Sequence, residues 1–222
     1  MTPGFDIIGD VHGHADKLEA LLLALGYQQH GAGFIHPRRK AIFVGDVIDR
    51  GPNVRRVVDI VVTMVESNSA YFILGNHEIN FINWHRQIGL SGNFAFPRSK
   101  SNQLQLHQTL RAYSEEEQLA LVDWLVNQPL FLEFPNFRVI HASWDQRFVT
   151  RYLEQFQTCC LSIEALRLSD TNPWLLQGID RVTRGVNIRL PEGHFVMGND
   201  GISRRRVRAK FWSQAPQVLG DV

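Results

Sequence analysis

Three short stretches decide how this 222-residue chain folds: GDVHG at Gly9–Gly13, GDVIDRG at Gly45–Gly51 and GNHE at Gly75–Glu78. Each stretch directly follows a short apolar run and places polar side chains just past it. Apolar runs of this length that end at glycine are typical of buried strands in a parallel sheet. Because ligands bind beyond the carboxyl ends of such strands, we expect the three stretches to meet at one edge of the sheet.

The segments around these stretches support that arrangement. Strands are predicted at Phe5–Ile8, Ala41–Val44 and Tyr71–Leu74. Between them, Leu18–Leu25 and Val54–Val65 carry apolar residues at helical spacing, and a third helix is predicted from Glu78 to Arg86. Regular alternation of strand and helix predicts an α/β fold with a parallel sheet.

The pattern changes after the third helix. We predict a loop over the site, a helix opened by the Ser114 and Glu117 capping box, a hairpin, a helical stretch, and short strands that close a second sheet. These are placed at Leu90–Asn102, Ser114–Asn127, Leu130–Ile140, Thr150–Leu168 and from Gly185 onward. No internal repeat or linker is visible, so the prediction is a single domain over residues 1–222.

Composition limits the classes of function. Apolar residues make up 44% of the chain and charged residues 20%, and the formal net charge is +1, so no global field indicates nucleic acid or a membrane as partner. The cysteines are the adjacent pair Cys159 and Cys160, which is no disulfide framework. The N-terminal stretch does not look like a signal peptide, and the apolar run Val57–Val65 is too short for a membrane span. We therefore expect a cytoplasmic protein.

A basic cluster near the C-terminus has two interpretations. It consists of Arg204, Arg205, Arg206, Arg208 and Lys210. It is either a solvated strand face or an anion-binding surface, and the sequence does not decide between them. Binding of nucleic acid to this cluster is the weakest hypothesis.

The polar residues past the strands suit divalent metal ions. Asp10 and His12 lie two apart after the first strand, where Gly9 and Gly13 allow a tight loop, and Asp46 follows the second strand. Asn76 offers an amide oxygen after the third strand, and His141 ends a later apolar run. A set of carboxylates and imidazoles favours a transition metal. Taken singly, each residue could instead be a turn, a helix cap or a core histidine, but three similar motifs together favour the metal.

Three further residues indicate chemistry rather than metal binding. His77 follows Asn76 directly and could protonate a leaving oxygen as a general acid. Asp49 could hold His77 in the required tautomer and keep it cationic. Arg50 offers a bidentate fork for phosphate oxygens, with a surface ion pair as the alternative.

These residues carry a family resemblance. The motifs GDVHG, GDVIDRGP, GNHE and VIHASW resemble those of the calcineurin-like metallophosphoesterases, and most closely the branch of Ser/Thr protein phosphatases and bacterial symmetrical diadenosine tetraphosphatases. The resemblance spans Gly9 to Trp144. It implies a two-sheet β-sandwich flanked by helices, with a dinuclear metal site at one edge.

The resemblance also implies the roles of individual residues. Asp10, His12 and Asp46 would hold the first ion, and Asp46, Asn76 and His141 would hold the second together with one more histidine. Arg50 would grip the phosphate and His77 with Asp49 would serve the leaving group.

The last ligand departs from the family pattern. The remaining histidine is His194, in PEGHF, and its surroundings match the family poorly. We take His194 as the candidate, with a surface turn as the alternative, in which case Asn199 or Asp200 could replace it. A second phosphate-binding arginine is placed at Arg184 or Arg181, and Arg184 and Asn76 are counted with Arg50 among the substrate-binding residues; the alternative for both arginines is a charged loop.

The expected reaction is hydrolysis of a phosphate ester or anhydride by a hydroxide that bridges two divalent ions, with manganese expected and iron, zinc or nickel as alternatives. A phosphoprotein phosphatase-like enzyme acting on phosphomonoesters is the first hypothesis. A diadenosine tetraphosphatase-like hydrolase of nucleotide anhydrides is the alternative. Phe94 and Phe96 could stack a base, cap the core or dock a peptide. A third hypothesis is an inactive metal-binding scaffold.

Overall fold

The computed structural model describes residues 4–89, 92–198 and 203–209. Along the chain, the elements up to residue 100 are β1 (Gly4–Ile8), α1 (Ala15–Ala24), β2 (Gln28–His30), β3 (Gly33–Ile35), β4 (Arg39–Phe43), α2 (Val54–Glu66), β5 (Ala70–Phe72), α3 (Asn76–His85), β6 (Gln87–Ile88) and β7 (Asn93–Phe94). They are followed by α4 (Lys100–Ala112), α5 (Glu115–Leu125), β8 (Phe131–Glu133), β9 (Arg138–Ile140), α6 (Gln146–Phe156), α7 (Ile163–Ser169), α8 (Pro173–Arg184), β10 (Asn187–Arg189), β11 (Val196–Met197), β12 (Ser203–Arg204) and β13 (Arg206–Arg208).

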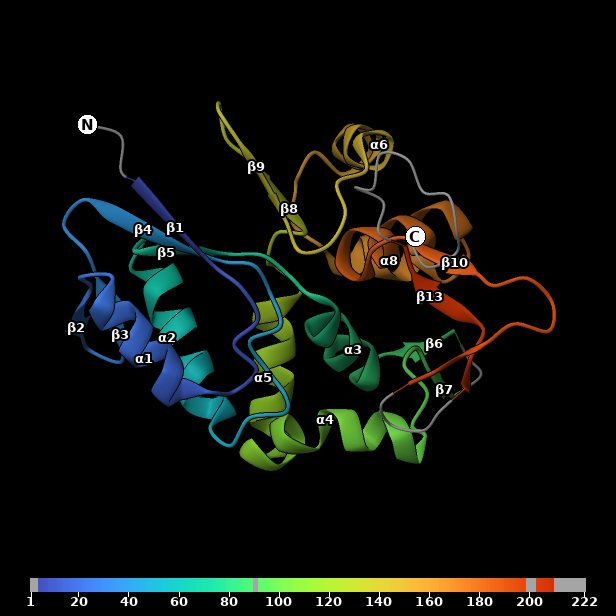
Figure 1. The fold of residues 1–222 in the computed structure, drawn as a ribbon, viewed down its shortest axis with the longest axis horizontal. Helices are drawn as coiled ribbons and strands as arrows, with labels where there is room; N and C mark the ends of the chain where they lie inside the picture. Colours follow the sequence, from blue (N-terminus) through green and yellow to red (C-terminus); the bar gives the residue numbers. More distant parts are fainter. Residues whose placement is uncertain (1–3, 90–91, 199–202, 210–222) are drawn as a thin grey trace.

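A three-stranded parallel sheet positions the site. Its order is β1-β4-β5, with Ile8 opposite Phe43 and Phe43 opposite Phe72. All three strands therefore end at the same edge, and the loops that leave them run side by side (Figure 1). The predicted parallel arrangement of the first three strands is confirmed.

The sheet is covered on both faces. One face packs on α1 and α2 through a core that includes Leu22, Phe43 and Val61. The other face packs on the β8–β9 hairpin, where Ile42, Ile73 and Val139 form a second core with Phe5 and its aromatic neighbours. The hairpin is antiparallel, so a parallel and an antiparallel layer of strands face each other beneath flanking helices. The α/β fold class and the layered arrangement of strands flanked by helices are thereby confirmed.

After α3 the structure departs from the expected elements in three places. The stretch Thr150–Leu168 is two helices, α6 and α7, with Cys159 and Cys160 between them and no disulfide. Arg181 and Arg184 lie on α8, which excludes the charged loop that was the alternative for both residues. The predicted loop extends to Asn102, but helix α4 already begins at Lys100.

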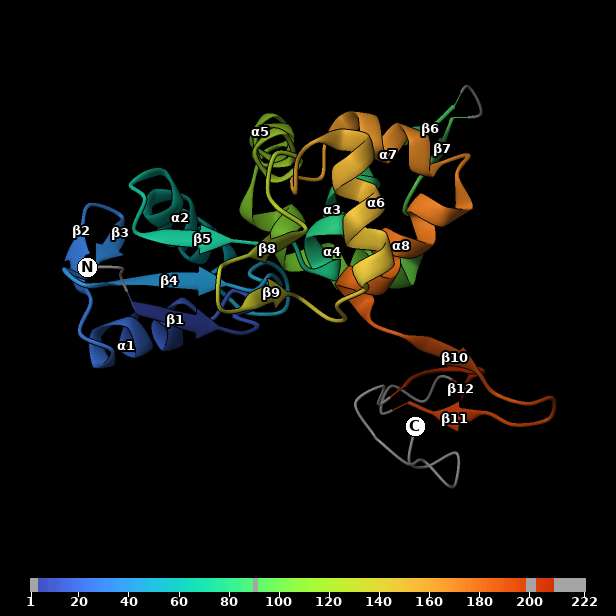
Figure 2. The same cartoon turned by 90° about the horizontal axis from the view of Figure 1, so that it is seen from above.

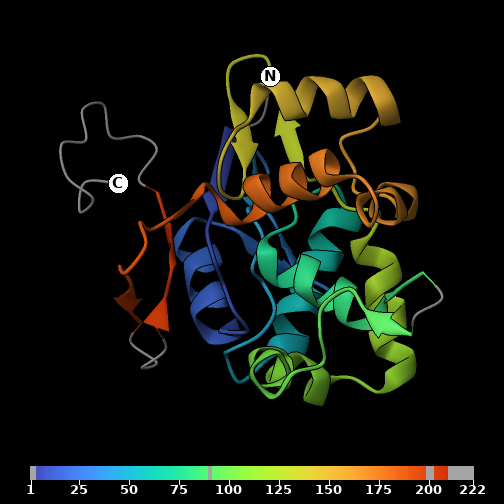
Figure 3. The same ribbon diagram turned by 90° about the vertical axis from the view of Figure 1, so that its right-hand side faces the viewer.

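The strands from Gly185 onward do not form a closing sheet among the described residues. β10 pairs with β13 and β11 pairs with β12, each as a separate antiparallel pair. Figure 2 shows these pairs away from the parallel sheet, and Figure 3 shows them to one side of the helices. Arg204, Arg205, Arg206 and Arg208 are all exposed there, and Lys210 lies outside the described residues. No described helix is both long and apolar enough to cross a membrane.

Candidate metal centre

Main-chain hydrogen bonds join the loops that follow β1 and β4. The amides of Val11 and His12 donate to the carbonyl of Asp46 at 3.1 and 2.9 Å, and the Gly51 amide donates to the His12 carbonyl at 2.8 Å. Four non-glycine residues in these loops have positive φ, namely His12, Asp46, Asp49 and Arg50. Such backbone is costly outside glycine and clusters at functional sites. Backbone strain is therefore concentrated where the sequence places its candidate ligands.

Two glycines allow the loops to approach closely. A Cβ on Gly75 would lie 2.3 Å from Asp46 Oδ1, and one on Gly45, which also has φ of +87°, would lie 2.3 Å from the Gly75 amide nitrogen. No side chain fits at either distance, so both positions require glycine. The glycines of GDVIDRG and GNHE thus bring the Asp46 carboxylate against the third loop.

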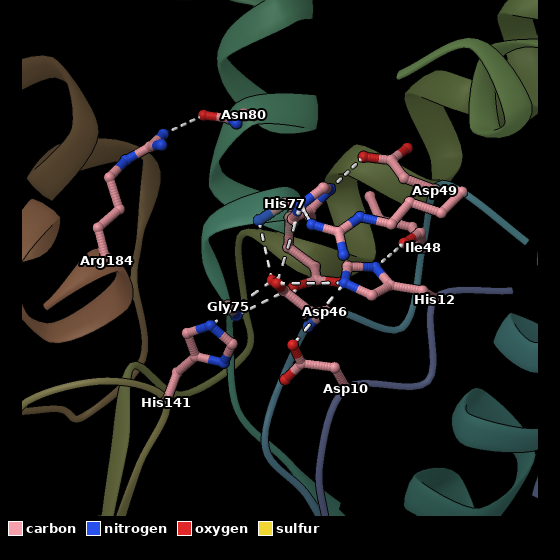
Figure 4. Close-up of polar contacts among 12 residues, drawn as sticks. Asp10, His12, Asp46, Ile48, Asp49, Gly75, His77, Asn80, His141 and Arg184 are labelled. Atoms are coloured by element: carbon pink, nitrogen blue, oxygen red, sulfur yellow. Dashed lines mark hydrogen bonds and ion pairs between the residues drawn. The ribbon is translucent and has the colours of Figure 1, made fainter. Parts of the chain in front are cut away.

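Asp46 lies between the imidazoles of His12 and His141 (Figure 4), which contact the main chain in the same way. His12 directs Nδ1 to the Ile48 carbonyl at 2.9 Å, and His141 directs Nδ1 to the Val44 carbonyl. Each then turns Nε2 toward Asp46, at 3.7 Å from Oδ2 for His12 and 3.7 Å from Oδ1 for His141. A main-chain carbonyl that accepts from Nδ1 fixes the tautomer whose Nε2 lone pair can bind a metal.

The donor set fits divalent metal ions. Among the described residues, two groups have atoms close enough to share an ion: His12, Asp46 and His77, and Asp10, Asp46 and His141. The Nε2 atom of His12 is buried and has no hydrogen-bond partner in the described part of the chain. Burial lowers the pKa of His12, which favours the neutral ring that a metal requires. A buried, unpaired nitrogen beside two carboxylates is the arrangement that a transition metal would complete.

Asn76 is half-buried at the first position of α3, and Gly75 occupies the cap position. The next amide, that of His77, donates to Asp46 Oδ1 at 3.0 Å. The structure thus brings the start of α3 to the same carboxylate as the two imidazoles. The role of Asn76 as a ligand stays a prediction.

His77 has a different environment from the other two imidazoles. Its Nδ1 lies 2.6 Å from Asp49 Oδ2, and its Nε2 lies 3.9 Å from Asp46 Oδ2 and 3.4 Å from Arg50 Nη2. Burial alone would lower the pKa of His77, but the hydrogen bond that its ring donates to Asp49 and the charges of Asp46, Asp49 and Glu78 outweigh burial and raise that pKa. The ring is therefore set up to carry a proton on Nε2 toward the site.

Thr109 on α4 holds the carboxylate of the His77–Asp49 pair in place. Thr109 is fully buried; its Oγ1 donates to Asp49 Oδ1 and accepts from the Asp49 amide at 3.0 Å. Asp49 itself is 0% exposed, so Thr109 satisfies polar groups that water does not reach. Sequence reasoning missed Thr109 because it lies 60 residues away from Asp49 along the chain.

Glu78 is a second residue whose role was missed, although the GNHE motif contains it. Its carboxylate is fully buried and accepts from the amides of Asp46, Val47 and Gly75 at 2.8, 2.9 and 2.9 Å. Burial and the nearby charge of Asp46 raise the pKa of Glu78 to about 7, against the three amide hydrogen bonds. Glu78 therefore ties the second and third loops together beneath the metal ligands.

Replacing Glu78 with glutamine should destabilise the protein. A glutamine would turn an NH₂ group toward at least one of the three buried amide donors, and we expect a loss of about 3 kcal/mol. For a chain of this length that is a fall in melting temperature of roughly 6–12 °C, measurable by calorimetry. Glu154→Gln on the exposed side of α6 is the matched control and should melt with the wild type. An unchanged melting temperature for E78Q would contradict the role given to Glu78.

Comparison with known proteins identifies the family. A family model described as calcineurin-like phosphoesterase matches residues 4–158. The chain belongs to the calcineurin-like phosphoesterase family. The family explains why the strand-end residues converge on Asp46, and it implies divalent metal ions at these residues.

Relatives of this phosphoesterase carry a more specific name. A bis(5'-nucleosyl)-tetraphosphatase PrpE [asymmetrical] from Halalkalibacterium halodurans is 32% identical over 178 residues, covering 76% of this chain and 68% of that protein. A protein of the same name from Oceanobacillus iheyensis is 48% identical over 73 residues, which are 32% of this chain and 29% of that protein. This second match spans under a third of its relative. The activity that the two names state is therefore only a proposal for this chain.

A solved structure confirms the fold alone. A cold-active protein tyrosine phosphatase aligns with a TM-score of 0.52 at 15% identity, covering 82% of this chain and 56% of that one. At this identity the likeness says nothing about the substrate of this phosphoesterase.

The two candidate arginines of α8 have different partners. Arg184 reaches α3, where its Nη2 donates to the buried Asn80, while its Nε pairs with Asp180 Oδ1 at 2.7 Å. Arg181 pairs instead with Asp145. Arg184 therefore lies nearer to the His77 helix than Arg181 does, and its contact with substrate stays a prediction.

His194 is not brought to the metal centre. It lies exposed on the turn between β10 and β11, with Nδ1 3.2 Å from the Glu192 carbonyl, and neither metal-binding group includes it. Its role as the last ligand stays a prediction, and the substitutes Asn199 and Asp200 lie outside the described residues. The Gly-His pair in the sequence therefore did not suffice to place this histidine in space.

The two phenylalanines of the predicted loop are already engaged. Phe96 packs against the main core, and the Arg98 guanidinium lies 3.7 Å from the ring centre of Phe94. Leu90 of this loop lies outside the described residues. Capping of the core is the interpretation that suits Phe96.

Proposed function

We propose that this chain is a metal-dependent hydrolase of nucleotide anhydrides that acts on bis(5'-nucleosyl) tetraphosphates. The observation that carries the proposal is the Halalkalibacterium halodurans relative, whose match covers most of both chains and whose name states this substrate. This relative favours the alternative hypothesis, a hydrolase of nucleotide anhydrides, over the hypothesis of a phosphoprotein phosphatase. The relatives' names also specify asymmetrical cleavage, in contrast to the symmetrical enzymes that the motifs resemble.

The proposal assigns the metal ligands as follows. Asp10, His12 and Asp46 would hold one ion, and Asp46 with Asn76 and His141 a second. When bound, divalent ions at such positions lower the pKa of water and draw charge from phosphoryl oxygens. Manganese as the resident ion, and a cytoplasmic location, are part of the proposal. Metal analysis of the protein purified from its native source tests the first.

Two side chains of the protein act on the substrate itself: Arg50 on the transferred phosphoryl group and His77 on the leaving group. Arg50 is exposed beside His77 and can bind phosphoryl oxygens with its planar fork. Hydrolysis forms a new P–O bond from water and breaks the bridging P–O bond, and the departing oxygen takes the proton from His77 Nε2. Asp49 stays hydrogen-bonded to Nδ1 and stabilises the imidazolium until that transfer.

One experiment distinguishes a hydrolase of nucleotide anhydrides from a phosphoprotein phosphatase. We would measure kcat/KM for diadenosine tetraphosphate, for a panel of phosphopeptides and for nitrophenyl phosphate, with Mn²⁺ added. The proposal expects the highest value for diadenosine tetraphosphate, with AMP and ATP as products. A higher value for any phosphopeptide would overturn it, and two molecules of ADP would contradict the asymmetrical cleavage. No hydrolysis of any phosphate ester would favour the inactive scaffold.

Thr109 should act as a positioning residue for the acid. In Thr109→Val the Asp49 amide and Oδ1 lose their buried partner, and we expect turnover to fall about 10-fold with an alkyl leaving group. With the better nitrophenyl leaving group the fall should be smaller, because that oxygen needs a proton less. Thr109→Ser keeps the hydroxyl and should restore the rate. Equal losses on both substrates would mean that Thr109 is merely structural.

A further inference from the structure

We propose that a pocket on α4 binds the nucleoside carried by the leaving group. This inference rests on the proposed function and names a part of the substrate that the metal centre does not contact. The pocket has a volume of about 570 Å³ and is lined by Arg50 and His77 from the site, by α4, and by Arg204 from β12. A space of this size takes a ligand much larger than a phosphate group.

The pocket lies on the side of the site from which the proton comes. His77 presents Nε2 to the site while Nδ1 is held by Asp49, and Arg50 lies 3.4 Å from that Nε2. Since the general acid must touch the departing oxygen, whatever that oxygen carries extends into the space beside His77. That space is the α4 pocket.

The chemistry of α4 suits a nucleoside. Four residues spaced i, i+3, i+4 and i+7 form one face of the helix and line the pocket, and we call them the α4 stripe: Ser101, Leu104, Gln105 and Gln108. Leu104 is 76% exposed and offers an apolar surface for the face of a base. The two glutamine amides offer donors and acceptors for its edge, and glutamine can pair in this way with adenine.

One of these amides has an unpaired donor. Gln105 Nε2 is buried and has no hydrogen-bond partner among the residues that the structure describes. A buried donor without a partner is costly, and a ligand acceptor at the pocket wall would relieve that cost.

The stripe is held in a fixed position relative to the acid. The opposite side of α4 packs into the protein through the buried Leu106 and Thr109, and Thr109 is hydrogen-bonded to Asp49. The helix that would read the nucleoside is thus joined by a single residue to the pair that would protonate the leaving oxygen. A rigid connection of this kind suits one leaving group of defined size rather than varied peptide segments.

The test uses two inhibitors that share a triphosphate chain and differ only in the nucleoside. We would measure the inhibition constants of ATP and of inorganic tripolyphosphate against nitrophenyl phosphate hydrolysis by the wild type, Gln105→Leu and Gln108→Leu. Gln103→Leu is the matched control, because Gln103 is an exposed residue of α4 that does not line the pocket. Melting temperatures of all variants check that they are folded.

The expected result is that ATP binds about 10-fold more tightly than tripolyphosphate to the wild type, and that either stripe variant removes most of this difference. Tripolyphosphate binding should stay unchanged in all variants, and Gln103→Leu should behave as the wild type. Equal affinities for both inhibitors in the wild type would overturn the inference, as would losses that affect both inhibitors alike. Stripe variants that slow phosphopeptide hydrolysis without changing ATP binding would make the pocket a peptide site and overturn it too.

These outcomes are separable from the proposed function. If the wild type discriminates for ATP but does not cleave diadenosine tetraphosphate, the nucleoside pocket stands and the proposed substrate falls. If it cleaves diadenosine tetraphosphate but binds ATP and tripolyphosphate equally, the proposed function stands and the pocket falls.

Discussion

Replacing Asp46 with asparagine is expected to remove metal and activity together. The carboxylate of Asp46 lies 3.7 Å from His12 Nε2 through Oδ2 and 3.7 Å from His141 Nε2 through Oδ1. It is the one group that both candidate metal-binding sets share. We therefore expect kcat to fall on the order of 10³-fold or more with any phosphate ester, because the loss affects both ions.

The amide should affect the two ions unequally. The His77 amide donates to Oδ1 at 3.0 Å, so the asparagine carbonyl will stay there and its NH₂ group will replace Oδ2 and face His12. The ion held with Asp10 and His12 should then be lost first. Mass-spectrometric metal analysis of the dialysed protein measures this as a drop in bound Mn²⁺ per chain.

Stability separates loss of metal from misfolding. In the metal-free protein the Asp46→Asn change removes a buried negative charge next to Glu78, so its melting temperature should not fall below that of metal-free wild type. Asp123→Asn on the exposed side of α5 is the matched control and should keep both metal and activity. A D46N protein that is inactive but retains its full metal content would contradict the shared-ligand role.

The residues that could be predicted are those whose position follows from strand ends. Asp10, His12 and Asp46 each lie within a few residues of a strand in a parallel sheet, so the topology alone brings them together. His141 also follows a strand directly, although that strand, β9, belongs to the antiparallel hairpin and not to the parallel sheet. Local spacing sufficed wherever a rigid strand fixed the start of the loop.

Residues that act across helices could not be predicted in this way. The helix α4 buries only Leu106 and Thr109 of its own residues, so its sequence shows little amphipathic pattern and its contact with Asp49 is invisible beforehand. The role of Glu78 depends on amides from two separate loops, and no spacing encodes their meeting. For α8 there was a local signal, since Asn172 followed by Pro173 is a typical helix start.

Replacing His77 with asparagine should distinguish a general acid from a metal ligand. His77 lies within reach of both roles, because its Nε2 is 3.9 Å from Asp46 Oδ2 and it belongs to one of the two metal-binding groups. Its Nδ1, however, is paired with a buried carboxylate, whereas His12 and His141 use a main-chain carbonyl. A carboxylate partner raises the pKa of His77 and so favours the protonated ring, which cannot bind a metal.

We therefore expect H77N to keep its Mn²⁺. Its loss of activity should be larger the more the leaving oxygen of the substrate depends on a proton. With an alkyl phosphate kcat should fall about 10²-fold, and with nitrophenyl phosphate clearly less, because a general acid contributes most where the leaving oxygen is most basic. Steady-state kinetics on both substrates, together with metal analysis of the same preparation, measure the difference. His30→Asn, at an exposed histidine of β2, controls for the substitution itself. Equal losses on both substrates would reject the acid, and a loss of metal from H77N would instead make His77 a ligand.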